Sequence, residues 1–240
     1  MGLFSMFKKE KQNNVWDTID KSDFIQVFSA CLGKMMVIQN RAAELVVKNR
    51  NWNVDFSKGW IAFGEDQYPV ELIGTESNQS NTWNWAYNNV NHFPDSMIKI
   101  ATDTYEKGQK WKLDALTMAQ FTLDEIYNGH NLAIVACGIS ERDCCYYRGP
   151  HDRGAILVMF HGVSKEVFKP IDLLKFVSIT GQCVQNFTLN HKIFVEAFLQ
   201  WNQTKYTWDG DTIIADFSQK LYIVFEKVED LYRIIEIKTK

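Results

Sequence analysis

The chain has 240 residues, of which 46% are hydrophobic and 23% are charged, and its formal net charge is −3. This length is enough to bury a hydrophobic core, and the composition excludes an intrinsically disordered chain. Because the net charge is slightly negative and the basic residues are scattered, there is no electrostatic reason to expect a nucleic-acid-binding protein.

Neither a secretion signal nor a membrane span is predicted. The first 14 residues contain a short apolar patch followed by lysines, the reverse of a secretory signal, and they are expected to form a disordered tail. No apolar run approaches the roughly 20 residues that span a bilayer. Five cysteines are present without a C-x-x-C pair, which indicates reduced thiols in a cytoplasmic protein without stable membrane association.

The first part of the chain is predicted to form one long helix followed by antiparallel strands. Apolar residues recur every three or four positions from 17 to 48, which predicts a helix, and Asp20 or Ser22 is a suitable N-cap. The period then changes to two, and glycine-containing turns separate the alternating segments, as in a meander. Its strands are expected at residues 52–56, 60–63, 68–73 and 83–87.

The second part is predicted to contain further helices and strands. A helix is expected over 95–110, and Thr122 opens a capping box that predicts a short helix ending near 128. The continuous apolar run 132–139 predicts a strand buried on both faces. The remaining elements are expected to be a hairpin at 144–148 and 155–161, helices at 170–186 and 189–201, and strands at 212–217, 221–226 and 231–237.

Together these elements predict an α+β fold in which antiparallel sheets pack with helices. Residues 15–240 are expected to form a single domain, and a sub-boundary is considered near 112–122. Residues 54–57 and 215–218 both contain Asp-Phe-Ser, and both precede a predicted hairpin turn. Two interpretations of this similarity stay open: the chain has two similar α+β halves, or it uses the same hairpin solution twice.

Residues 74–91 combine amide side chains with aromatic rings and contain no Lys or Arg. Flat rings supply contact area and amides supply orientation, a mixture that suits a ligand-binding cleft. In the other interpretation, the rings belong to the core and the amides bond to neighbouring backbone. The candidate ligand-binding residues of this segment are Glu76, Asn78, Asn81, Trp83, Asn84, Trp85 and Asn88.

Two further segments are candidates for the same site. His130 and Asn131 precede the predicted buried strand, and His130 is suited to act as a base or a donor near neutral pH. Tyr147, Arg148 and His151 belong to a hairpin with a Gly- and Pro-containing tip, where a guanidinium can hold an anionic group. A turn histidine and a plain hairpin tip are the alternatives. We expect all three segments to converge on one pocket, with Arg148 as its charge anchor.

These residues favour a non-enzymatic module that binds an unknown small polar molecule or a protein partner. The alternative is a hydrolase-like enzyme in which Glu76 and His130 form an acid–base pair, which requires both groups to reach one reacting atom. A nucleophilic Cys145 paired with His130 or His151 is a further option. No cofactor motif is present, and the five histidines lack metal-site spacing. An interaction protein without a cleft would instead expose an apolar patch.

Several runs of sequence carry a resemblance to a known family. They are WNVDFSKGWIAFG (52–64), YPVELIGTESNQSNTWNWAYNN (68–89), YNGHNLAIVACGI (127–139), CYYRGPHDRGAI (145–156) and HKIFVEAFLQWN (191–202). Over residues 16–225 the chain resembles an uncharacterised bacterial family whose members carry a domain of unknown function. The resemblance implies a bacterial cytosolic protein, and it brings no catalytic residues with it.

Overall fold

The computed structural model describes residues 13–229 and 231–240. Over this part of the chain, helices combine with antiparallel sheets, so the predicted α+β class is confirmed. The α-helices are α1 (Phe24–Ala42), α2 (Lys99–Trp111), α3 (Asp114–Thr117), α4 (Gly129–Gly138), α5 (Leu173–Asn186) and α6 (His191–Trp201). A π-helical turn at Ala43–Val47 extends α1, and 3-10 turns lie at Val15–Asp17, Ala86–Asn88, Asp95–Met97 and Lys165–Phe168.

The strands within the described ranges form two separate sheets. The first has seven strands: β1 (Trp52–Asp55), β2 (Trp60–Phe63), β3 (Asp66–Ser77), β4 (Thr82–Trp85), β5 (Gln120–Thr122), β6 (Cys145–His151) and β7 (Gly154–Phe160). Strands β1 to β5 are paired in order, and the β6–β7 hairpin joins the sheet where β7 pairs with β3. The second sheet is a four-stranded meander of β8 (Lys205–Asp209), β9 (Thr212–Asp216), β10 (Lys220–Val228) and β11 (Leu231–Thr239).

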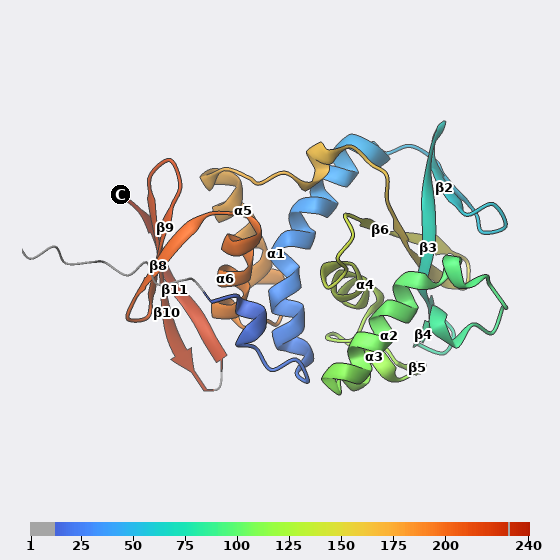
Figure 1. The fold of residues 1–240 in the computed structure, drawn as a ribbon, viewed down its shortest axis with the longest axis horizontal. Helices are drawn as coiled ribbons and strands as arrows, with labels where there is room; N and C mark the ends of the chain where they lie inside the picture. Colours follow the sequence, from blue (N-terminus) through green and yellow to red (C-terminus); the bar gives the residue numbers. More distant parts are fainter. Residues whose placement is uncertain (1–12, 230) are drawn as a thin grey trace, which may run out of the picture.

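Helix α1 lies between the two sheets (Figure 1). On one side, α6 and α5 lie between α1 and the four-stranded sheet; on the other side, α4 lies between α1 and much of the seven-stranded sheet, whose strand β6 also contacts α1 directly. The two sheets differ in strand number and connections, although residues 54–57 and 215–218 both run from a strand into a hairpin turn. Residues 112–122, considered above as a boundary, contain α3 and β5, and β5 pairs with β4.

The long N-terminal helix is confirmed, with a different start. Asp23, rather than Asp20 or Ser22, is the N-cap, because its carboxylate accepts hydrogen bonds from the backbone N–H groups of Ile25 and Gln26. Gly33 of α1 lies against α6, where an added Cβ would come within 2.5 Å of Phe198. Glycine at this position therefore allows the two helices to approach closely.

The predicted strand at 132–139 is wrong, because these residues belong to helix α4. Asn128 caps the helix by accepting a hydrogen bond from the Asn131 N–H at 3.0 Å. Residues from Leu132 to Cys137 are at most 1% exposed, since α4 packs between α1 and the sheet. A helix buried on all sides has no polar face, and its sequence is as uniformly apolar as that of a central strand.

The region before α4 also differs from expectation. The capping box at Thr122 does not start a helix: Thr122 ends strand β5, and Asp124 closes the following turn by accepting from the N–H groups of Ile126 and Tyr127. Strand β4 ends at Trp85, so Tyr87 lies in a 3-10 turn and not on the strand. Near the C-terminus, β8 was not predicted, whereas the three strands that follow it were.

A bulge in β3 determines which side chains share a face of the seven-stranded sheet. Leu72 pairs with Val158 and Gly74 pairs with Leu157, so Ile73 is an extra residue without a partner on β7. Glu71 and Glu76 are five positions apart and would point to opposite faces of a regular strand. Because of the bulge, both carboxylates point to the face that the helices cover.

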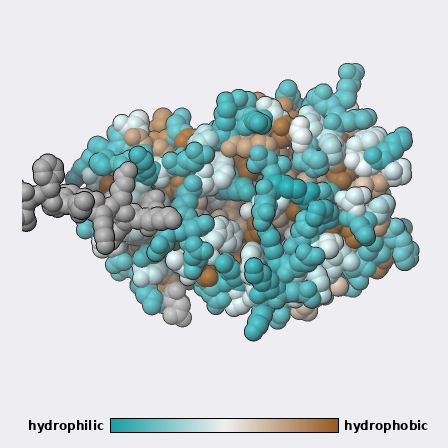
Figure 2. Space-filling model, in the orientation of Figure 1, coloured by the Kyte–Doolittle hydropathy of each residue, from teal (hydrophilic) through white to brown (hydrophobic). Residues whose placement is uncertain are grey.

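Hydrophobic residues on the face shown in Figure 2 are scattered in small groups among hydrophilic ones, without one broad patch. Among the described helices, none is long and apolar enough to cross a bilayer. Of the predicted N-terminal tail, residues 1–12 lie outside the described range. The backbone carbonyl of Asn13 accepts a hydrogen bond from Gln200 on α6, and Asn14 caps the first 3-10 turn.

Candidate functional site

Three of the residues proposed from the sequence meet on the helix-covered face of the first sheet. Glu76 is 9% exposed, and its two carboxylate oxygens accept separate hydrogen bonds. One comes from the backbone N–H of Gly129 at 2.8 Å and the other from Arg148 Nε at 2.7 Å. His130 follows Gly129 and lies near both charged groups. The carboxylate thus fixes the positively polarised N-terminus of α4 against the sheet.

Gly129 is required for this contact. An added Cβ would lie 2.5 Å from Glu76 Oε1 and 2.9 Å from Leu157 Cδ1. We expect Gly129→Ala to lower the free energy of unfolding by about 2 kcal/mol, because the carboxylate must move away from the helix. Urea denaturation measures this, with Gly181→Ala in α5 as control, where the added Cβ meets nothing within 4 Å. An equal result for the two variants would contradict the proposed role of Gly129.

The two tryptophans of residues 74–91, proposed as ligand-binding residues, are buried as in the other interpretation of this segment and are not available to a ligand. Trp83 is 0% exposed and Trp85 is 1% exposed. Both lie on the face of β4 that the helices cover, and the Trp85 indole N–H donates to the carbonyl of Ala115 in α3 at 2.9 Å. Their rings pack edge to face with centroids 5.2 Å apart, so they are core residues.

The asparagines of the same segment do not join the cluster around Glu76. Asn84 alternates with the two tryptophans and therefore points to the opposite face of the sheet. With Asn88 it lines a hollow of about 50 Å³, far smaller than the few hundred Å³ of ordinary ligand pockets. Asn81, which has positive φ, donates to the carbonyl of Leu123, and the Asn78 N–H donates to the carbonyl of Arg153. The last two therefore serve turn and loop structure.

The expected Arg-containing loop at 149–154 is also absent. Strands β6 and β7 continue to a two-residue turn at Asp152 and Arg153. Tyr147 points away from Arg148 and packs against Trp52, with ring centroids 5.4 Å apart. His151 is exposed at the strand end, where its Nδ1 accepts from the Arg153 N–H. Arg148 is therefore an ion-pair partner of Glu76 and is not a clamp at a hairpin tip.

The principal cavity, of about 750 Å³, lies between α1, α4 and the loop that follows α5, and we call it the α1–α4 cavity. Its volume is in the range of small-molecule sites. Apolar side chains from three segments form much of its wall: Phe24, Phe28, Met36, Ile134 and Phe187. Of the predicted site residues, only His130 and Asn131 line it; Glu76 and Arg148 do not.

His130 is held at the cavity by Tyr146 on β6. The His130 Nδ1 lies 3.3 Å from the Tyr146 hydroxyl, which is buried. Burial and the nearby Arg148 guanidinium lower the pKa of His130, whereas the Glu76 carboxylate acts in the opposite direction. Burial also raises the pKa of Tyr146, so its hydroxyl remains protonated and can donate to Nδ1. The neutral imidazole then carries its proton on Nε2.

Four exposed residues at the cavity have polar atoms that solvent can reach and that make no hydrogen bond to the described residues: His130 Nε2, Asn186 Oδ1, the Thr188 hydroxyl and the Glu125 carboxylate. Gln39 differs, because its amide donates to the Tyr146 carbonyl and accepts from the Tyr146 N–H, which ties α1 to β6. The cavity thus combines an apolar wall with a few polar groups that solvent or a ligand can reach, a composition that suits a binding site.

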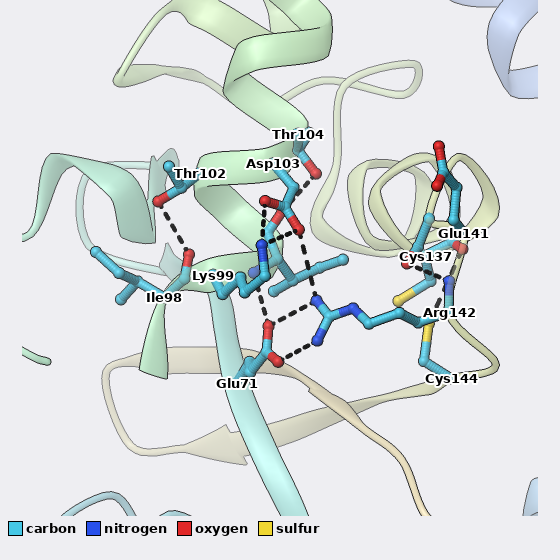
Figure 3. A network of polar contacts seen from close by, with 12 residues as sticks. Glu71, Ile98, Lys99, Thr102, Asp103, Thr104, Cys137, Glu141, Arg142 and Cys144 are labelled. Atoms are coloured by element: carbon cyan, nitrogen blue, oxygen red, sulfur yellow. Dashed lines mark hydrogen bonds and ion pairs between the residues drawn. The ribbon is translucent and has the colours of Figure 1, made fainter. Parts of the chain in front are cut away.

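A second buried carboxylate, which sequence reasoning missed, lies further along β3. Glu71 accepts two hydrogen bonds from Arg142, and it also accepts from the Ile100 N–H at 2.7 Å in the first turn of α2 (Figure 3). Arg142 also faces Asp103, which pairs with Lys99. A hollow of about 370 Å³ adjoins this network. Because these charges are already paired with each other, we assign the network to stability.

Cysteine and metal chemistry find no support in the described part of the chain. Cys145 is fully buried, and burial raises the pKa of its thiol, so it is not an activated nucleophile. In residues 13–229 and 231–240, no three His, Cys, Asp or Glu side chains come together in a group that could hold a metal ion.

Residues 25–163 match the family of unknown function DUF6882, and this match covers more than half of the chain. The chain belongs to this family. The matched segment contains α1 except its first residue, the whole seven-stranded sheet and α4, and thus most of the α1–α4 cavity. Four lining residues lie outside the family match: Phe24, Asn186, Phe187 and Thr188. Neither a curated protein nor a solved structure matches the chain.

Proposed function

We propose that the protein is a ligand-binding module and that the α1–α4 cavity is its binding site. The observation that carries this proposal is a cavity of about 750 Å³ that has an apolar wall and solvent-accessible polar side chains at its rim. The site proposed from the sequence is thereby moved from the Asn- and Trp-containing segment to the groove beside His130. A ligand for it has an apolar body and at least one hydrogen-bonding group.

The geometry supports binding better than the acid–base alternative. Both oxygens of Glu76 already accept hydrogen bonds, and its carboxylate does not line the cavity that His130 faces. General acid–base catalysis requires both groups to reach the same reacting atom. The alternative of a partner-interaction protein is not favoured by a specific surface, since the exposed large hydrophobic residues of the described chain come from separate elements.

The proposal also includes a cytoplasmic location in bacteria. All five cysteines are buried and free, which suits a reducing compartment. The bacterial origin rests on the resemblance of the sequence motifs described above.

A neutral solvatochromic dye tests the cavity. We expect Nile red to bind the purified protein saturably, with one dye per chain, and to shift its emission to the blue. Met36→Trp, which fills the apolar wall, is expected to weaken dye binding at least about tenfold, because the added ring occupies the same volume. Leu45→Trp, at a residue 45% exposed on the extension of α1, is the matched control and should bind as the unmodified protein does. Equal binding by both variants would reject the cavity as the site.

A further inference from the structure

The formal charge on the lining of the α1–α4 cavity is negative. Glu125 is the single formally charged side chain among the fifteen described residues that line it, and none of them is Lys or Arg. Burial and the Arg148 guanidinium lower the pKa of His130, which favours its neutral form. A phosphate or carboxylate ligand would normally be met by Arg or Lys, and the described lining residues include neither.

Other carboxylates lie beside the same opening. Asp23 caps α1 immediately before Phe24, and Asp124 closes the turn immediately before Glu125. Phe24 packs on Tyr127 with ring centroids 4.9 Å apart, which brings these two acidic segments together. The pKa of Tyr127 is raised by burial and further by Asp124, Asp23 and Asp114, as expected where the local potential is negative.

The positively polarised helix N-termini at the cavity do not offset its negative potential. Helices α1 and α4 both begin beside it, and a helix N-terminus attracts anions. Each end is already occupied, however, because Asp23 accepts from the first turn of α1 and Glu76 accepts from Gly129 of α4. Arg148, whose charge lowers the pKa of His130, is likewise paired with Glu76.

We propose that the α1–α4 cavity takes a small amine: a molecule with an aromatic or aliphatic body and one positive charge. This rests on the proposed function and adds the chemical class of the ligand. Phe24, Phe28 and Phe187 enclose the body of the ligand, and their ring faces also attract a cation. The exposed carboxylate of Glu125 pairs with the ammonium group at the rim.

Three probes with the same body test the charge preference: tryptamine, tryptophol and indole-3-propionate, which are cationic, neutral and anionic. Isothermal titration calorimetry is expected to give the lowest Kd for tryptamine, at least about tenfold below that of indole-3-propionate. Raising the salt from about 0.05 to 0.5 M should weaken tryptamine binding and leave tryptophol binding nearly unchanged.

Two matched variants test whether Glu125 causes the preference for a positively charged ligand. Glu125→Gln is expected to weaken tryptamine about two- to fivefold, as for a solvent-exposed ion pair, and to leave tryptophol unchanged. Glu65→Gln makes the same charge change in the exposed β2–β3 turn and should alter neither. If the protein binds Nile red but binds tryptamine no better than indole-3-propionate, or not at all, the charge preference is overturned and the cavity remains a binding site. Failure of Nile red and all three indoles to bind rejects both proposals.

Discussion

Replacing Glu71 with alanine is expected to lower the free energy of unfolding by about 3 kcal/mol, because it leaves a partly buried guanidinium without its partner. Glu71 is 6% exposed and accepts hydrogen bonds from Arg142 and from the Ile100 N–H. Helix α2 has no capping side chain of its own at Ile98, so this carboxylate also completes its first turn. One substitution therefore loosens β3 from both α2 and the α4–β6 loop. Urea denaturation of the purified variant measures the loss.

Two comparisons distinguish the contribution of the buried Glu71–Arg142 contact to stability from a general effect of removing a negative charge. Glu141→Ala removes a carboxylate that is 94% exposed beside the same network, and it should change stability by less than about 0.5 kcal/mol. In a double-mutant cycle, Glu71→Ala and Arg142→Ala together should cost clearly less than the sum of the single changes. Additive losses, or a loss below about 1 kcal/mol for Glu71→Ala alone, would show that the contact contributes little.

Local patterns in the sequence predicted the fold class and most elements correctly. Helix α1 has apolar residues at helical spacing, β1 alternates with period two, and glycine turns follow β1 and β2, so these patterns were sufficient. The sequence pattern did not predict helix α4, because a helix that is buried on all sides has no polar face to reveal its period. The available signals were Asn128 as an N-cap and the helix-favouring Ala133 and Ala136, and the unbroken apolar run obscured them.

The candidate site was harder to predict because long-range contacts decide it. Glu76 was chosen for its polar neighbours, whereas its partner Arg148 is 72 positions away. The bulge at Ile73 places Glu71 on the same face as Glu76. The residue types in β3 do not predict this bulge. Trp83 and Asn84 alternate as predicted, but only the sheet pairing shows which face the helices cover. Consequently, the sequence indicated candidate residues and not the cavity.

His191 is expected to make the free energy of unfolding depend strongly on pH. This first residue of α6 is 6% exposed, and its Nδ1 accepts from the Ile234 N–H at 3.0 Å on β11. Burial, followed by the Arg233 guanidinium 3.1 Å from Nε2, lowers the pKa of His191 to about 4. In the unfolded chain the pKa of histidine is about 6.5. The unfolded state therefore binds more protons between these values, and stability rises with pH across this window and is constant with respect to His191 above it.

The expected size of this rise is about 3 kcal/mol between pH 4 and 6.5, from roughly 1.36 kcal/mol for each pKa unit. His191→Asn keeps an acceptor for the Ile234 N–H but cannot titrate, so denaturation curves at a series of pH values should show a smaller slope for this variant. Arg233→Gln leaves the histidine and removes the neighbouring charge, which should raise the pKa of His191 and give an intermediate slope. A slope that neither substitution changes would mean that other groups cause the pH dependence, and that the contact between α6 and β11 is insensitive to the charge of His191.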